Sequence, residues 1–138
     1  MTITEFLEAR IAEDEAAAKA ATPGPWEWEP ETDGWGDCGP DLVTVAKLPP
    51  YPDGSQSPVE TVIGSWGHDA NGITVEPADA QHIARHDPAR VLAECAAKRA
   101  IIELSVNWDG FTRNVDVLRA LAAVYADHPD YQEAWAVG

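Results

Sequence analysis

The chain has 138 residues, 45% of them hydrophobic, which is enough for one domain with its own core. Its 24 acidic and 9 basic side chains give a formal net charge of −15, which repels free nucleic acid and anionic membranes and suits a basic protein partner. No run of about 18 apolar residues is present, which argues against a membrane-spanning helix. The acidic first residues lack the basic and apolar regions of a signal peptide, so we expect a cytoplasmic protein.

The N-terminal segment has the pattern of an amphipathic helix. Thr2 and Glu5 have the spacing of a capping box. The hydrophobic residues that follow at helical spacing are Ile3, Phe6, Leu7, Ile11, Ala17, Ala18 and Ala21. We therefore expect a helix over residues 3–21. The Thr-Pro-Gly-Pro sequence at 22–25 ends it, because two prolines and a glycine cannot continue a helix.

Four short segments predict β-strands. Trp and Glu alternate over residues 26–29, as in a half-buried strand, and further strands are expected at 41–46, 59–66 and 73–75. The connections are too short for helical crossovers, so we expect an antiparallel sheet. We expect three tryptophans to fill the core between this sheet and the helices, namely Trp26, Trp28 and Trp66.

Two helices are predicted on either side of a break at His86-Asp87-Pro88. Proline disfavours the helical conformation in the residue before it, so Asp87 leaves the first helix (77–85) and is free to cap the second. Pro88 suits the first helical position, where no N–H is needed. The second helix, 88–105, has a hydrophobic stripe that comprises Val91, Leu92, Cys95, Ala96, Ile101 and Ile102.

The C-terminal part predicts one more helix. Asn114 is a candidate cap, and hydrophobic residues recur at helical spacing from 115 to 125. Tyr131 and Trp135, four residues apart, indicate a last helical turn that folds back onto the body. The prediction is a single α+β domain over 1–138. In it a small antiparallel sheet packs against the N-terminal helix and the long central helix, and a C-terminal helix completes the fold.

Three segments resemble a known family: TPGPW (22–26), HIARHDPARVL (82–92) and YADHPDYQEAW (125–135). Together they resemble a family of small acidic proteins of unknown function from streptomycetes, related actinobacteria and their phages. A looser similarity, through TPGPW and the A-D-A-x-x-I-A start at 78–84, is to phage early-region accessory proteins. The resemblance implies the fold, the source and a phage connection. It implies no activity, catalytic residue or cofactor.

His82 and His86 are four residues apart, a spacing that can supply two zinc ligands from one helix face. The candidate third ligands are His68, Asp69, Asp79 and Asp87. The intervening Ile-Ala-Arg does not give the His-Glu-x-x-His pattern of a metalloprotease. We therefore favour packing or surface histidines, and we keep a metal-dependent hydrolase that uses this region as an alternative.

Arginines and tryptophans supply the other candidate binding residues. Arg85, Arg90 and Arg99 form the basic cluster, which could hold a small anionic ligand at the start of the helix from Pro88. Balancing surface acids is the interpretation we favour for them. Trp35 and Trp135 are candidates for an interface or a pocket. The predicted ligand-binding residues are therefore Trp35, Arg85, His86, Arg90 and Trp135.

The leading hypothesis is a non-enzymatic accessory factor of a phage or its host, with an anti-defence role as one option. It would bind a protein partner or sequester a small nucleotide-like ligand, with no cofactor, no catalytic residue and no bound metal. A homo-oligomer is left open. A DNA mimic is the third alternative, but of the acids only Glu27, Glu29 and Glu31 have regular spacing, too few to imitate a duplex. The expected binding face combines this acidic strip with an exposed Trp35 and Trp135.

Overall fold

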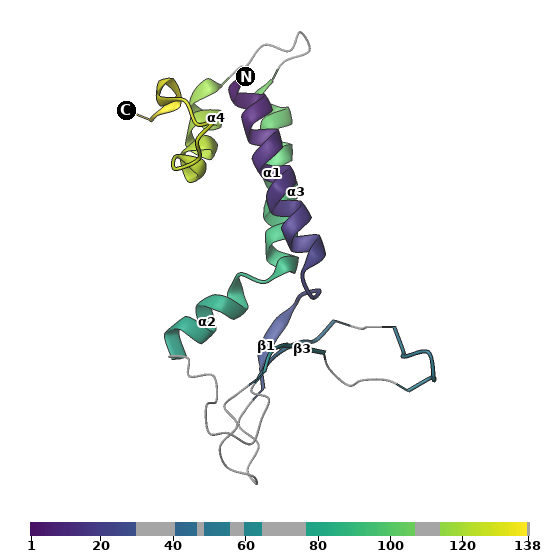
Figure 1. Ribbon diagram of the computed structural model, residues 1–138. Helices are drawn as coiled ribbons and strands as arrows, with labels where there is room; N and C mark the ends of the chain where they lie inside the picture. The colour runs from purple at the N-terminus through teal and green to yellow at the C-terminus, as the bar shows by residue number, and fades with distance from the viewer. Residues whose placement is uncertain (30–40, 47–48, 56–59, 65–76, 107–113, 138) are drawn as a thin grey trace. The chain divides into compact units, whose positions relative to one another are not determined.

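The computed structural model describes residues 1–29, 41–46, 49–55, 60–64, 77–106 and 114–137 (Figure 1). These residues contain four α-helices and a three-stranded antiparallel sheet, which confirms the α+β class. Residue contacts divide the chain into two compact units, the first made of 1–17 and 92–138 and the second of 18–91. The single domain stays a prediction. The packing of the sheet against the two long helices also stays a prediction.

Helices form the first unit. α1 (Ile3–Ala20) and α3 (Pro88–Ser105) contribute most of their length to it. α4 (Val115–Ala122) and two 3-10 turns, η1 (Ala123–Tyr125) and η2 (Glu133–Trp135), complete it. The predicted capping box is confirmed, because the Thr2 N–H donates to Glu5 Oε2 at 2.7 Å and the Glu5 N–H donates to Thr2 Oγ1 at 3.2 Å. Asn114 caps α4 as expected, by accepting from the Val117 N–H.

The core of this unit lies between α1, α3 and α4. Its buried hydrophobic side chains are Ile3, Phe6, Leu7, Ile11, Cys95, Ile102, Leu118, Ala122 and Trp135. α1 and α3 lie side by side (Figure 1), and the Cys95 Sγ is 3.8 Å from the Ile11 carbonyl oxygen. Burial raises the pKa of the Cys95 thiol. Cys95 is therefore a core residue, as its place in the stripe predicted.

The buried stripe of α3 is narrower than the sequence predicted. Cys95 and Ile102, seven residues apart, are buried, whereas Leu92 is half-buried and Ala96 is exposed. With 3.6 residues per turn, Ala96 lies about 100° around the helix from Cys95, off the line that faces α1. Including Ala96 in the stripe was wrong.

The second unit holds the sheet and α2 (Pro77–Arg85). The strand order is β1 (Trp26–Trp28), β2 (Leu42–Thr44), β3 (Glu60–Ile63), and both pairs are antiparallel. The central strand β2 is buried along its whole length. It is shorter than the predicted 41–46, and the Thr44 hydroxyl accepts the Ala46 N–H just past its end at 3.1 Å. The predicted strand at 73–75 lies outside the described residues.

α2 lies against the sheet through a tryptophan. Trp28 Nε1 donates to the Ala80 carbonyl oxygen at 2.7 Å. The inward-facing residues of α2 are half-buried, and no residue of this helix is fully buried. Trp26 and Trp28 are also half-buried rather than enclosed, and among the described strands β1 pairs with β2 alone. Trp66 lies outside the described residues.

Candidate functional site

The junction between α2 and α3 is fixed by Asp87, which is buried. Its Oδ1 accepts the Arg90 N–H at 2.9 Å, which confirms the predicted helix cap. Its Oδ2 accepts the Trp26 N–H at 3.0 Å. One carboxylate therefore joins the start of α3 to the TPGPW segment at 22–26, a bond that sequence analysis did not foresee.

The TPGPW segment is shaped for this contact. A Cβ on Gly24 would lie 2.9 Å from both the Cβ and the backbone nitrogen of Ala89, and 3.0 Å from the Asp87 Cγ, so only glycine fits without a shift. Trp26 Nε1 donates to the Thr22 carbonyl at 3.0 Å, and the Thr44 hydroxyl donates to the Pro23 carbonyl. Two of the three family-like segments thus meet at Asp87, and their contacts there are structural, because they join residues 22–26 to the start of α3.

Beside this junction lie four exposed side chains, which we call the junction cluster: His82, Arg85, His86 and Arg90. The rings of His82 and His86 have centroids 4.2 Å apart. His86 Nδ1 lies 2.7 Å from the His82 carbonyl oxygen. A carbonyl only accepts hydrogen bonds, so we assign the proton of the His86 ring to Nδ1. The Nε2 of His86 is then the ring nitrogen that can accept a hydrogen bond.

A metal site at these histidines would need a third ligand. Among the residues that the structure describes, no group of three or more His, Cys, Asp or Glu side chains is arranged to hold a metal ion. His68 and Asp69, two of the candidate third ligands, lie outside that part of the chain. Asp87, another candidate, uses its two oxygens for the Arg90 and Trp26 N–H groups.

Three of the predicted ligand-binding residues, Arg85, His86 and Arg90, come together in the junction cluster. Arg90 Nη1 donates to the Arg85 carbonyl at 3.4 Å. An anion approaching the start of α3 would meet the Asp87 carboxylate that already caps it, which opposes binding there. Arg99 belongs to the first unit, where it bonds Glu15 Oε2 at 2.7 Å and lies 3.7 Å from Glu8 Oε2. The hydrogen bond to Glu15 raises the pKa of Arg99.

The structure describes one of the two predicted tryptophans. Trp35 lies outside the described residues. Trp135 is 8% exposed, so the expectation of an exposed side chain was wrong. Its ring lies 5.0 Å from that of Phe6 and 5.8 Å from that of Tyr131, centroid to centroid, because η2 turns the indole toward α1.

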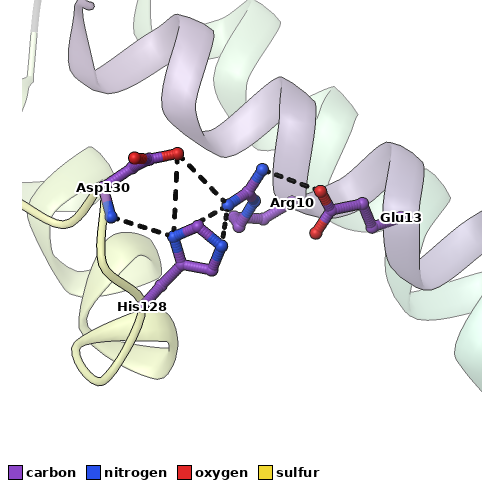
Figure 2. A network of polar contacts seen from close by, with 4 residues as sticks. All are labelled: Arg10, Glu13, His128 and Asp130. Carbon is purple, nitrogen blue, oxygen red and sulfur yellow. Dashed lines mark hydrogen bonds and ion pairs between the residues drawn. The ribbon is translucent and has the colours of Figure 1, made fainter.

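A polar network in the first unit was not predicted (Figure 2). We call it the tail network, and its members are Arg10, Glu13, His128 and Asp130. Arg10 is 7% exposed. Its Nη2 donates to Glu13 Oε1 at 2.8 Å, its Nη1 is within bonding range of both ring nitrogens of His128, and Asp130 Oδ2 lies 3.8 Å away. The Asp130 N–H donates to His128 Nδ1 at 3.1 Å.

A second polar chain ties η1 to α1 and α3. The Tyr125 hydroxyl donates to Asp14 Oδ2 at 2.7 Å, and Lys98 Nζ donates to the same hydroxyl at 3.1 Å. Burial, together with the bond to Asp14, raises the pKa of Tyr125 well above its ordinary value. Tyr125 therefore stays a neutral donor over the physiological pH range.

One sequence signal pointed to the tail network. Arg10 falls four residues after Phe6 and three after Leu7, on the face of α1 that also carries Ile3. A charged residue on an apolar helix face needs buried partners, since burying an unpaired charge is costly. The pattern could therefore have indicated that Arg10 has a partner, but it could not identify His128, which is 118 residues away.

Comparisons with known proteins bear on the family. A family model described as a family of unknown function (DUF6221) matches residues 1–137. The searches of curated proteins and of solved structures return no match to this chain.

In the part of the chain that the structure describes, no helix has both the length and the apolar character needed to cross a membrane.

Proposed function

The chain belongs to this family of unknown function, and we propose that it is a non-enzymatic acidic binding protein that engages a basic protein partner. The three family-like segments support the finer proposal of an accessory factor from actinobacteria or their phages. We place its action in the cytoplasm, as the sequence suggested.

The main observation behind this proposal is that three cations of the first unit lie against carboxylates of the same unit. Arg10 bonds Glu13, and Arg99 bonds Glu15. Lys98 Nζ lies 3.9 Å from Asp14 Oδ2. These positive charges are already neutralised by carboxylates of α1.

Other carboxylates of this unit face solvent, including Glu103, Asp127 and Glu133. With a net charge of −15 over the chain, the surface produces a negative field that speeds association with a basic protein. The same field repels nucleic acid, which supports a protein partner over direct DNA or RNA binding.

The second candidate is a protein that sequesters a small anionic ligand. It rests on the junction cluster, where Arg85, His86 and Arg90 are exposed next to one another. The Asp87 carboxylate at the start of α3 weakens this candidate. A DNA mimic is less favoured, because Glu27 is exposed on β1 whereas Glu29 is half-buried, which breaks the regular acidic strip.

Co-purification from the native host tests the proposal. The tagged protein is compared with a neutral variant (Glu103→Gln, Asp127→Asn, Glu133→Gln) and with a charge-conserving control (Glu103→Asp, Asp127→Glu, Glu133→Asp). We expect the wild type and the control to capture the same basic protein and to release it at about 0.5 M salt, where the Debye length falls to a few ångströms. The neutral variant should capture much less.

Other outcomes would support other functions. Equal capture by the neutral variant, or capture that resists high salt, would contradict a charge-driven interface. Competition by duplex DNA for the captured protein would favour mimicry. A nucleotide released on denaturation would favour sequestration of a small ligand. Tightly bound zinc would favour the hydrolase that uses His82 and His86.

A further inference from the structure

We propose that the C-terminal tail, residues 126–137, is held on α1 by a pH-sensitive contact between Arg10 and His128, which opens when the imidazole takes up a proton. The contact joins two parts of the first unit that are far apart in sequence (Figure 2).

Arg10 depends on this contact because its guanidinium is buried. Its Nε is enclosed and has no hydrogen-bond partner within the described residues. Its Nη2 is taken by Glu13, and its Nη1 is directed at the His128 ring. The guanidinium carbon also lies 5.5 Å from the centroid of the Phe6 ring, a favourable cation–π distance.

The hydrogen-bonding capacity of imidazole sets the direction of the response. Two donors face the ring of His128, the Arg10 Nη1 and the Asp130 N–H. A neutral imidazole has one nitrogen that can accept a hydrogen bond, and an imidazolium has none. Protonation therefore removes the acceptor, whichever tautomer is present. The bond that is lost is charge-assisted and comparatively strong.

Charged groups face His128 from both α1 and the tail. From α1 it faces the Arg10 cation, whose Nη1 lies 2.8 Å from Nδ1, and Glu13 is already bonded to that cation. From the tail it faces the Asp130 carboxylate, 3.9 Å from Nδ1 and 55% exposed. The neighbouring Tyr125 hydroxyl is a neutral donor to Asp14. The Arg10 contact is the shorter of the two and part-buried, so protonation of the ring would place two cations against each other there.

Opening would uncover an aromatic surface. The Phe6 ring contacts three rings of the tail, those of His128, Tyr131 and Trp135, with centroids 5.0 to 6.1 Å away. These contacts end if the tail leaves α1. Arg10 would keep its bond to Glu13, so its guanidinium stays paired in the open state.

Hydrogen–deuterium exchange of the tail peptide measures the opening. Histidine ordinarily changes charge between about pH 5 and pH 8, so exchange is compared at those limits and corrected for intrinsic rates. We expect the tail of the wild type to exchange about tenfold faster at the acid limit, which corresponds to about 1.4 kcal/mol. His128→Gln, which keeps an acceptor that does not titrate, should lose this response. His82→Gln, in the other unit, should keep it.

Two results would overturn the proposal: a wild-type tail whose exchange does not respond to pH, or a His128→Gln tail that responds as the wild type does. Nuclear magnetic resonance of the wild type provides a check that needs no variant. The ring protons of His128 and the indole N–H of Trp135 should change with one midpoint as the pH falls. Distinct midpoints would show that the tail opens independently of His128.

Discussion

Asp87 shows how a single residue can decide two local structures. Its carboxylate accepts one N–H from the first turn of α3 and one from β1. The proline rule and the cap preference predicted the first bond from local sequence. The second joins residues 61 positions apart, and no local pattern indicates a bond of that kind.

Replacing Asp87 by alanine should therefore cost more than an ordinary cap. Loss of the cap accounts for about 1 kcal/mol, and leaving the Trp26 N–H without a partner adds about 1 kcal/mol or more. We expect the free energy of unfolding to fall by about 2 kcal/mol in urea denaturation. Asp87→Asn keeps one acceptor oxygen and should lose about half as much. Equal stability of Asp87→Ala and the wild type would show that neither bond matters.

At the scale of elements, the helices and the first strand were predicted closely, whereas β2 and β3 were not. α2 and α3 begin and end at the predicted residues, because proline and cap signals mark their ends. The strands β2 and β3 are shorter than predicted, since their ends depend on pairing with neighbours rather than on their own composition. The hydrophobic stripe of α3 included Ala96 because alanine is apolar, although alanine also occurs on exposed helix faces.

The position of each residue on α3 should decide its contribution to stability. Ile102 is 3% exposed, so Ile102→Ala should lower the free energy of unfolding by about 2–5 kcal/mol. Leu92 is half-buried, so Leu92→Ala should cost less, about 1–2 kcal/mol. Ala96→Ser, at an exposed site, should change stability by no more than about 0.5 kcal/mol. Chemical denaturation of the three variants tests this order, and a larger loss for Leu92→Ala than for Ile102→Ala would contradict it.

At the scale of the whole molecule, composition predicted the acidic surface but not how its charges are paired. The sequence grouped Arg99 with Arg85 and Arg90 as one basic cluster. The fold pairs Arg99 with Glu8 and Glu15 of α1, as the favoured interpretation of balanced surface acids expected, although the sequence did not identify these partners. Pairings of this kind depend on which helices lie together, and the sequence leaves that open. The tail network was missed for the same reason, whereas the junction residues Arg85, His86 and Arg90 are neighbours in sequence and were predicted together.

The net charge of −15 should make stability depend on salt. Exposed carboxylates such as Glu103, Asp127 and Glu133 add to the net negative charge of the folded state, and salt screens the repulsion that this charge produces. Salt also weakens the exposed ion pairs, but such pairs contribute only about 0–1 kcal/mol each. We therefore expect the Tm to rise by about 3 °C between low and high sodium chloride, equivalent to about 1 kcal/mol for a chain of this length.

Calorimetry of the wild type and of the neutral variant (Glu103→Gln, Asp127→Asn, Glu133→Gln) checks this prediction. The neutral variant should have the higher Tm at low salt and the smaller response to added salt, because part of the repulsion has been removed. The charge-conserving control (Glu103→Asp, Asp127→Glu, Glu133→Asp) should respond as the wild type does. A Tm that falls as salt is added would mean that the internal pairs, chiefly Arg99 with Glu15 and Arg10 with Glu13, outweigh the surface repulsion. In that case the acidic surface would carry no net cost to stability.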